Sequence, residues 1–81
     1  MKLDYAERFI KSFEDAPPLI QKAFYKQSRL LLENLRHPSL RAKKYDEARD
    51  IWQARVTRGW RFYFKIAADT YYLIDIIPHP K

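Results

Sequence analysis

Basic and polar side chains alternate with apolar ones in the C-terminal half of the chain. The polar members of two alternating runs are Gln53, Arg55, Arg61, Tyr63 and Lys65. Because residues two apart in a strand point to the same face, these side chains are expected to share one face of a sheet. Arginine binds phosphate in bidentate fashion, and a tyrosine ring can stack on an unpaired base. The pattern is typical of a phosphate-binding surface, or else of a solvated face whose cations pair with Asp75.

The two histidines differ in what they could do. His79 follows the last β-rich run and lies between two prolines. An unperturbed imidazole titrates near pH ~6.5, so His79 is a candidate proton donor or acceptor, with an exposed tail residue as the alternative. His37 follows a helical pattern and is predicted to cap its last carbonyls. With no cysteine and no cluster of carboxylates, neither a metal site nor a cofactor is predicted.

The familiar catalytic motifs are missing from the sequence. There is no glycine-rich phosphate loop, no H-E-x-x-H motif and no G-x-S-x-G motif. Catalysis would therefore depend on cations and one histidine. Cleavage of RNA suits that set, because the ribose 2′-hydroxyl is already the nucleophile and the protein need only position it and stabilise the charged phosphorane.

Composition limits the partners and the architecture. The chain of 81 residues predicts a single domain, residues 1–81, and 47% hydrophobic residues exclude intrinsic disorder. The net charge of +6 favours an anionic partner, and most of the excess lies in residues 41–81, which carry nine basic and five acidic side chains. No apolar run is long enough for a membrane span and no signal peptide is readable, so we expect a soluble, cytoplasmic protein without a membrane partner.

Two helices are predicted in the first half of the chain, separated by Pro17-Pro18. Apolar residues recur at helical spacing on both sides of this pair. A proline ends the helix before it and suits the first position of the helix after it. We therefore predict one helix around residues 9–13 and a second from about residue 18 to residue 35. Residues 1–5 are predicted to form an edge strand.

The second half predicts an antiparallel meander. Strands are expected over residues 51–57, 60–66 and 71–77, with turns at Arg58-Gly59, where glycine would adopt a positive φ, and at residues 67–70. Residues 36–50 are predicted to be a loop, with one helical turn at 46–49. The fold class is α+β, with two N-terminal helices packed on an antiparallel sheet of three or four strands. The side chains predicted to face the helices are Trp52, Ala54, Val56, Trp60, Phe62, Phe64, Ile66, Tyr72, Ile74 and Ile76. Those predicted on the opposite face of the last strand are Tyr71, Leu73, Asp75 and Ile77.

Several segments together resemble a known family. The run I-W-Q-A-R-V-T-R-G-W-R-F-Y-F (residues 51–64), preceded by H-P-S-L-R-A-K-K-Y (37–45) and followed by Y-Y-L-I-D-I-I-P-H (71–79), resembles the RelE/ParE toxin superfamily of type II toxin–antitoxin modules. The upstream F-I-K-S-F-E-D-A-P-P-L-I-Q-K-A-F (9–24) is similar to the helical hairpin of that family. The resemblance covers nearly the whole chain.

The resemblance implies a set of catalytic residues. In the family, RelE-like and HigB-like members cleave mRNA in the ribosomal A site, whereas ParE-like members poison DNA gyrase. Arg61 matches the arginine that contacts the cleaved phosphate, and Arg55 falls where RelE-like toxins often carry a catalytic lysine. His79 matches the C-terminal histidine of HigB-like members. Gln53 stands where a second lysine is usual, and the chain ends at Lys81, before the tyrosine of RelE-like toxins. These departures imply a HigB-like arrangement, with His79 as general acid or base.

The leading hypothesis is a metal-independent mRNA endonuclease, the toxin of a toxin–antitoxin module. The expected partners are mRNA in the A site of the small ribosomal subunit and a cognate antitoxin that covers the basic face or the N-terminal edge strand. The predicted RNA-binding residues are Lys43, Lys44, Gln53, Arg58, Tyr63, Lys65 and Lys81. The alternatives are a ParE-like gyrase inhibitor, a catalytically inactive binding protein with the toxin fold, and a small basic RNA-binding or accessory domain.

Overall fold

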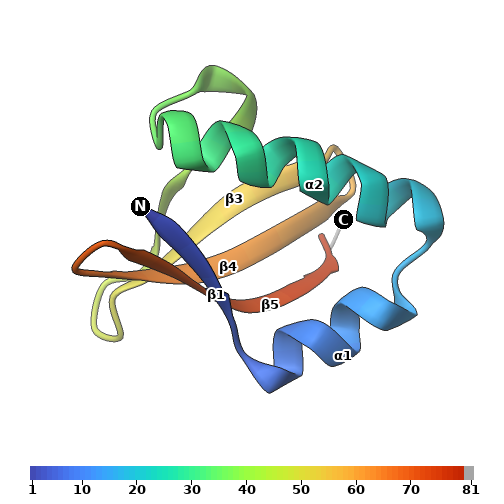
Figure 1. Cartoon of the computed structure of the whole chain (residues 1–81), viewed down its shortest axis with the longest axis horizontal. Coiled ribbons are helices and arrows are strands. Elements are labelled where there is room, and N and C mark those ends of the chain that lie inside the picture. Colours follow the sequence, from blue (N-terminus) through green and yellow to red (C-terminus); the bar gives the residue numbers. More distant parts are fainter. Residues whose placement is uncertain (80–81) are drawn as a thin grey trace.

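Two helices pack on a five-stranded sheet in the computed structural model, which describes residues 1–79 (Figure 1). The elements in chain order are β1 (Lys2–Tyr5), α1 (Glu7–Asp15), α2 (Pro18–Glu33), a short 3₁₀ helix η1 (Pro38–Leu40), β2 (Lys43–Asp46), β3 (Ile51–Thr57), β4 (Trp60–Ala67) and β5 (Thr70–Pro78). The predicted α+β class is confirmed, with five strands instead of three or four. None of the helices described is long and apolar enough to cross a membrane.

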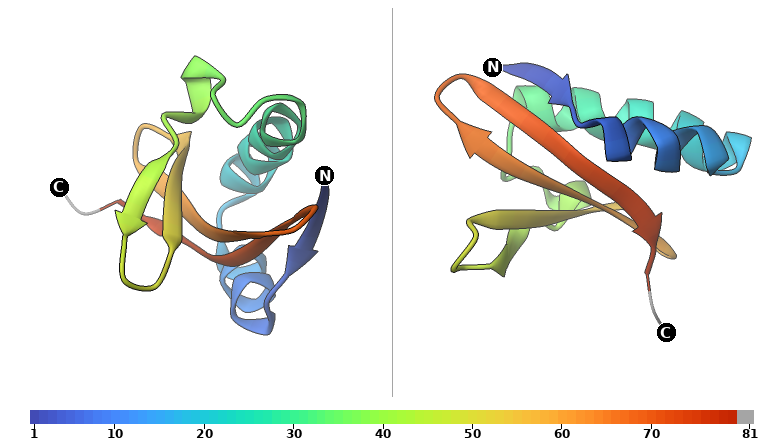
Figure 2. Two further views of the ribbon diagram at one scale, coloured as in Figure 1. Left: turned by 90° about the vertical axis from the view of Figure 1, so that its left-hand side faces the viewer. Right: turned by 90° about the horizontal axis from the view of Figure 1, so that it is seen from below.

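The sheet joins the two ends of the chain. Its strand order is β1-β5-β4-β3-β2, so β1 and β2 form the edges. The N-terminal strand β1 runs parallel to β5, and the other neighbouring pairs are antiparallel (Figures 1 and 2). The prediction of an N-terminal edge strand is thereby confirmed.

The Pro17-Pro18 pair separates the helices as predicted. α1 ends at Asp15, and α2 begins at Pro18, whose missing N–H would have no partner in a first helical turn anyway. The side-chain amide of Gln21 donates to the carbonyl of Phe13 at 2.8 Å and so fixes the start of α2 against the end of α1. α2 ends at Glu33, two residues before the predicted end.

The prediction of a loop over residues 36–50 is wrong, because this segment contains η1 and β2. Leu40 in η1 is fully buried, and β2 pairs with β3 at the sheet edge; the connection of the two strands is a turn in which Asp50 has a φ of 59°. His37 also differs from the prediction. Its Nδ1 accepts from the N–H of Ser39 at 3.1 Å, so it caps the beginning of η1 and not the end of α2.

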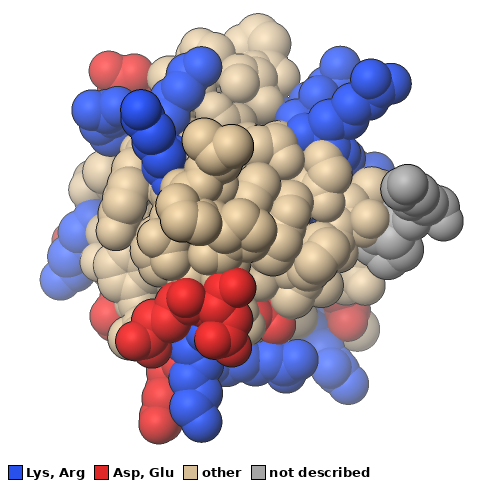
Figure 3. Space-filling view, turned by 90° about the vertical axis from the view of Figure 1, so that its right-hand side faces the viewer, with Lys and Arg blue, Asp and Glu red and all other residues tan. Residues whose placement is uncertain are grey.

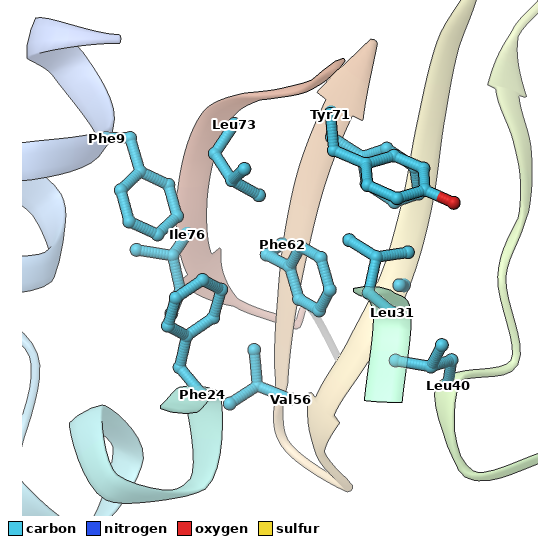
Figure 4. Packing of buried hydrophobic residues seen from close by; sticks show 11 residues of the cluster. Phe9, Phe24, Leu31, Leu40, Val56, Phe62, Tyr71, Leu73 and Ile76 are labelled. Carbon is cyan, nitrogen blue, oxygen red and sulfur yellow. The ribbon is translucent and has the colours of Figure 1, made fainter. Parts of the chain in front are cut away.

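The hydrophobic core lies between the helices and one face of the sheet (Figure 4). α2 packs across β3, and α1 packs on β5. The buried members of the core are Phe9, Phe24, Leu31, Leu40, Ala54, Val56, Phe62, Phe64, Tyr71, Leu73 and Ile76, with Trp52, Trp60 and Ile66 partly buried against them. The predicted core face of β3 and β4 is therefore confirmed.

The predicted faces of β5 are wrong for its first half. Tyr71 and Leu73 are buried in the core, whereas Tyr72 is 41% exposed and Ile74 lies outside the core. The cause is a β-bulge: Tyr63 pairs with Asp75, but the next residue of β4, Phe64, pairs with Leu73. One extra residue, Ile74, reverses the alternation of side chains on either side of it.

The β3–β4 hairpin turns at Arg58-Gly59 as predicted, but the conformational reason is different. Gly59 does not have a positive φ. A register shift between Arg55 and Thr57 leaves Val56 as an extra residue before the turn. The left-handed position instead occurs in the β4–β5 turn, where Ala68 has a φ of 53°.

Candidate nucleic-acid interface

Polar side chains from four strands meet on the sheet face opposite α2. Strand register brings Lys43 beside Gln53, Gln53 beside Tyr63, and Tyr63 beside Asp75. The next row places Arg55 directly opposite Arg61, which in turn lies opposite Ile77. The alternation of β3 and β4 therefore produces the expected polar face, and β2 extends it.

A cleft of about 320 Å³, here called the basic cleft, opens on this face. Its lining residues are Arg41, Lys43, Gln53, Arg55, Arg61 and His79. Four of the six are permanently cationic side chains at neutral pH, and the lining contains no carboxylate. Cations gathered in a concave surface focus a positive potential there, so the cleft favours an anion.

Arg55 is the least compensated charge of the cleft. Its Nε is buried and has no hydrogen-bond partner among the described residues. Burial, followed by the nearby charges of Arg41, Arg61 and Arg58, lowers the pKa of the Arg55 guanidinium. Since a guanidinium stays protonated in proteins, the group keeps both its charge and an unused donor. A phosphate oxygen in the cleft would satisfy both.

Arg61 is held in place by the hairpin turn. Its Nη1 donates to the carbonyls of Thr57 at 2.8 Å, Arg58 at 3.1 Å and Trp60 at 2.9 Å. All three bonds use one nitrogen, which leaves Nε and the other terminal nitrogen of Arg61 available to a ligand. The side chain is thus pre-oriented beside Arg55, and little conformational entropy is lost when it binds.

His79 lies at the mouth of the cleft because the end of β5 is fastened to the hairpin. Its backbone N–H donates to the carbonyl of Gly59 at 2.7 Å. The residue is exposed and lines the basic cleft together with Arg55 and Arg61. The three predicted catalytic residues are therefore brought together. Lys81, predicted to bind RNA, lies outside the described residues.

A neighbouring hollow of about 420 Å³, here called the tyrosine hollow, provides aromatic surface. It shares Lys43, Gln53 and His79 with the basic cleft and is also lined by Tyr45 and Tyr63. The two tyrosine rings lie 4.9 Å apart between centroids, and the Gln53 amide donates to the Tyr63 hydroxyl at 3.4 Å. Burial, and then the proximity of Tyr45, raises the pKa of Tyr63, so its hydroxyl stays protonated at neutral pH. Such rings are suited to stacking with unpaired bases.

No family model matches the sequence, and no curated protein matches it. Solved structures match the fold: the YoeB/ParE toxin from Agrobacterium tumefaciens is 14% identical with a TM-score of 0.82, covering 99% of this chain and 100% of that one. The RelB-RelE antitoxin-toxin complex from Methanococcus jannaschii matches at 17% identity and a TM-score of 0.77, over 93% of this chain and 88% of that one. The isolated E. coli RelE toxin matches at 18% identity and a TM-score of 0.77, over 98% of this chain and 84% of that one. The chain has the RelE/ParE toxin fold.

Within this RelE/ParE fold, three predicted RNA-binding residues do not line the basic cleft. Lys44 lines the tyrosine hollow; its ammonium contacts Asp50 and lies 5.3 Å from the centroid of the Trp52 ring. Lys65 is exposed opposite Tyr72 and lines neither the cleft nor the tyrosine hollow. Arg58 is exposed on the hairpin turn, beside the cleft.

The alternative in which Asp75 neutralises the arginines does not hold. Asp75 lies opposite Tyr63, and its Oδ2 forms an ion pair with Nε of Arg8 on α1 at 3.0 Å. At the end of the molecule shown in Figure 3, acidic side chains gather below a wide uncharged surface with basic side chains directly beneath them, and further basic side chains stand on the upper rim of that surface. The basic cleft therefore has no internal counterion among its lining residues.

Arg41 is the cleft residue that the sequence analysis missed. It follows η1 with a φ of 47°, and its N–H donates to the carbonyl of Pro38 at 3.3 Å. Arg41 belongs to a run of basic residues that comes before the first acidic residue of the segment 36–50, and this run was the signal in the sequence that could have identified it. That signal could not distinguish a cleft residue from a solvated one, because the segment was expected to be a loop.

Proposed function

We propose that the chain is the toxin of a type II toxin–antitoxin module and acts in the cytoplasm as a ribosome-dependent, metal-independent mRNA endonuclease. The observation that carries the proposal is the basic cleft, in which Arg55 and Arg61 lie opposite each other beside His79 with no carboxylate in the lining. The fold shared with the RelE toxin supports the toxin role. The tyrosine hollow supports a single-stranded nucleic acid as substrate.

The chemistry follows from these groups. The RNA phosphate binds in the basic cleft, where Arg55 and Arg61 donate to its non-bridging oxygens. The 2′-hydroxyl attacks phosphorus, the bond to the 5′-oxygen breaks, and a 2′,3′-cyclic phosphate is left on the upstream fragment. His79 serves as general acid or base, either accepting the 2′-hydroxyl proton or donating a proton to the departing 5′-oxygen. The two guanidinium groups stabilise the extra negative charge of the phosphorane, which exceeds that of the ground state.

A cognate antitoxin is the second proposed partner. The M. jannaschii structure is a RelB-RelE antitoxin-toxin complex. For this chain, an acidic antitoxin segment would cover the basic cleft or add a strand to β1, whose outer edge is open in the described chain. Binding at the cleft should weaken as salt is raised, because screening reduces the attraction between opposite charges. Affinity that does not change with salt would contradict the electrostatic part of this proposal.

Incubation of the purified protein with programmed ribosomes, followed by mapping of RNA 5′ ends, tests the enzymatic proposal. Arg61→Ala and His79→Ala are each expected to reduce cutting by about 100-fold or more, the usual effect of removing one group that stabilises a transition state. Arg29→Ala is the matched control, since Arg29 is exposed on α2 and lines neither the cleft nor the tyrosine hollow.

The outcomes separate the competing functions. Cutting that persists unchanged in both site variants would overturn the assignment of the cleft as the active site. Inhibition of gyrase supercoiling by wild-type protein, with no RNA cut at any codon, would overturn the endonuclease proposal in favour of a ParE-like activity. Equal unfolding midpoints of the variants and the wild type show that a loss of cutting is not caused by unfolding.

A further inference from the structure

A third hollow, here called the α2 hollow, adjoins the basic cleft. It has a volume of about 570 Å³ and lies between α2, η1 and the end of β3. Arg41 and Arg55 line both this hollow and the basic cleft, so the two hollows adjoin at these residues. Lys26 from α2 and Arg58 from the hairpin turn complete its charged lining.

The charge of the α2 hollow is as unbalanced as that of the cleft. It is bordered by Lys26, Arg41, Arg55 and Arg58, and its lining contains no acidic side chain. Both Arg41 and Arg58 contribute to the lowered pKa of Arg55, which shows that the cations of the two hollows repel one another. Surface cations ordinarily spread out or pair with carboxylates, and their concentration around two joined hollows suits a ligand with more than one negative charge.

A buried hydrogen-bond cluster holds the walls of the α2 hollow in place. Gln27 is only 4% exposed, and its Nε2 donates to the carbonyls of Arg55 at 2.9 Å and Ser39 at 3.2 Å. Ser39 returns a bond from its hydroxyl to Oε1 of Gln27 at 3.3 Å. One side chain of α2 thus fixes both β3 and η1. The backbone positions of Lys26, Arg41 and Arg55 are therefore set before any ligand arrives, which lowers the entropic cost of binding.

We propose that the α2 hollow binds the backbone phosphate next to the scissile phosphate of single-stranded RNA, with Lys26 and Arg58 as its binding residues. Arg41, which borders both hollows, contacts the strand as it passes between them. This inference rests on the proposed function for the identity of the neighbouring phosphate. Binding at a site remote from the reaction also means that RNA truncated on that side loses affinity and rate together.

The salt dependence of RNA binding by the full chain tests the inference without requiring cleavage. The probe is a fluorescent RNA of mixed sequence, about six nucleotides long, within the length range of known single-strand sites, and its 2′-hydroxyls are methylated to prevent cutting. For a single strand, each phosphate contact contributes about 0.7 to the slope of log K against log salt. Lys26→Ala and Arg58→Ala are each expected to reduce the slope by about that amount.

Lys11→Ala is the matched control, because it removes the same charge from an exposed position on α1 that does not line the α2 hollow. A full slope in Lys26→Ala and Arg58→Ala, equal to that of Lys11→Ala, would overturn the inference even if ribosomal cleavage is found. A reduced slope in both variants supports the α2 hollow as a phosphate site, and it does so even if no cleavage is found and the endonuclease proposal fails.

Discussion

Asp75 and Arg55 are two charged residues on the same face of the sheet, and the fold treats them in opposite ways. Asp75 is 7% exposed, yet its Oδ2 forms an ion pair with Arg8 at 3.0 Å and its Oδ1 accepts from the N–H of Ile76 at 2.9 Å. The Nε of Arg55 is buried among other arginines and has no partner in the described part of the chain. The anion is satisfied within the fold, and the cation is left for a ligand.

The placement of the carboxylates explains the difference. α1 packs on β5 and brings Arg8 to Asp75. Near the cleft, by contrast, the acidic residues of the β2–β3 turn bind cations of the same turn: Asp50 contacts Lys44, and Asp46 contacts Arg49. No carboxylate among the lining residues remains for Arg55. A buried polar group without a partner destabilises a fold, so the Nε of Arg55 does not contribute to stability, and this is why we propose the cleft as a binding site.

The largest effect on stability is expected at Asp75, the charge that is paired within the fold. Arg8→Ala leaves the buried carboxylate of Asp75 without its ion-pair partner, and the free energy of unfolding should fall by about 1 kcal/mol, because the exposed side chain of Arg8 is screened by solvent. Urea unfolding of this variant beside Lys11→Ala, on the same helix, measures the difference. Equal midpoints would mean that water already satisfies Asp75, and the contrast with Arg55 would disappear.

A smaller effect of opposite sign is expected at Arg55, the charge that has no partner in the described part of the chain. Arg55→Gln removes a charge that is repelled by Arg41, Arg61 and Arg58, so the urea midpoint should be equal to or above that of the wild type. Binding of the short RNA should weaken by about tenfold at the same time, because a charge-assisted hydrogen bond is lost. A clear drop in the unfolding midpoint would show that Arg55 is satisfied within the fold.

The smallest effect should appear in the salt dependence of stability. Raising salt from about 0.01 M to about 0.1 M shortens the screening length from about 30 Å to about 10 Å, so repulsion within the arginine cluster weakens and the melting temperature of the wild type rises. The rise should be smaller in Arg55→Gln than in Lys11→Ala, which lowers the net charge equally but outside the cluster. If the melting temperatures of these two variants respond identically to salt, the rise is caused by net charge alone.

Much of the fold was predictable from local chemistry. Pro17-Pro18 separates the helices because proline cannot continue a helix but suits the first position of one. The alternation in residues 51–57 and 60–66 correctly assigned the polar face of β3 and β4, since the register of an antiparallel hairpin preserves that alternation. The pairing of Arg55 with Arg61 and the polar position of Tyr63 follow from the same pattern.

The errors arise where distant contacts decide the structure. Nothing within β5 itself signals that Ile74 is an extra residue, because the bulge exists only relative to β4. β2 likewise forms because β3 offers an open edge, and η1 forms where Leu40 enters the core. Both short segments lack a periodic pattern of their own, so the sequence analysis assigned them to a loop and missed the role of Arg41.

The sequence by itself determined the α+β class, the two-helix start and the excess of cations on the outer face of β3 and β4, because these depend on residue spacing of a few positions. Only the tertiary structure decided which charges are compensated. Arg8 reaches Asp75 across more than sixty positions of the chain, whereas Arg55 meets Arg41 and Arg61 instead of a carboxylate. Charge compensation depends on distance in space, and that distance is created by packing.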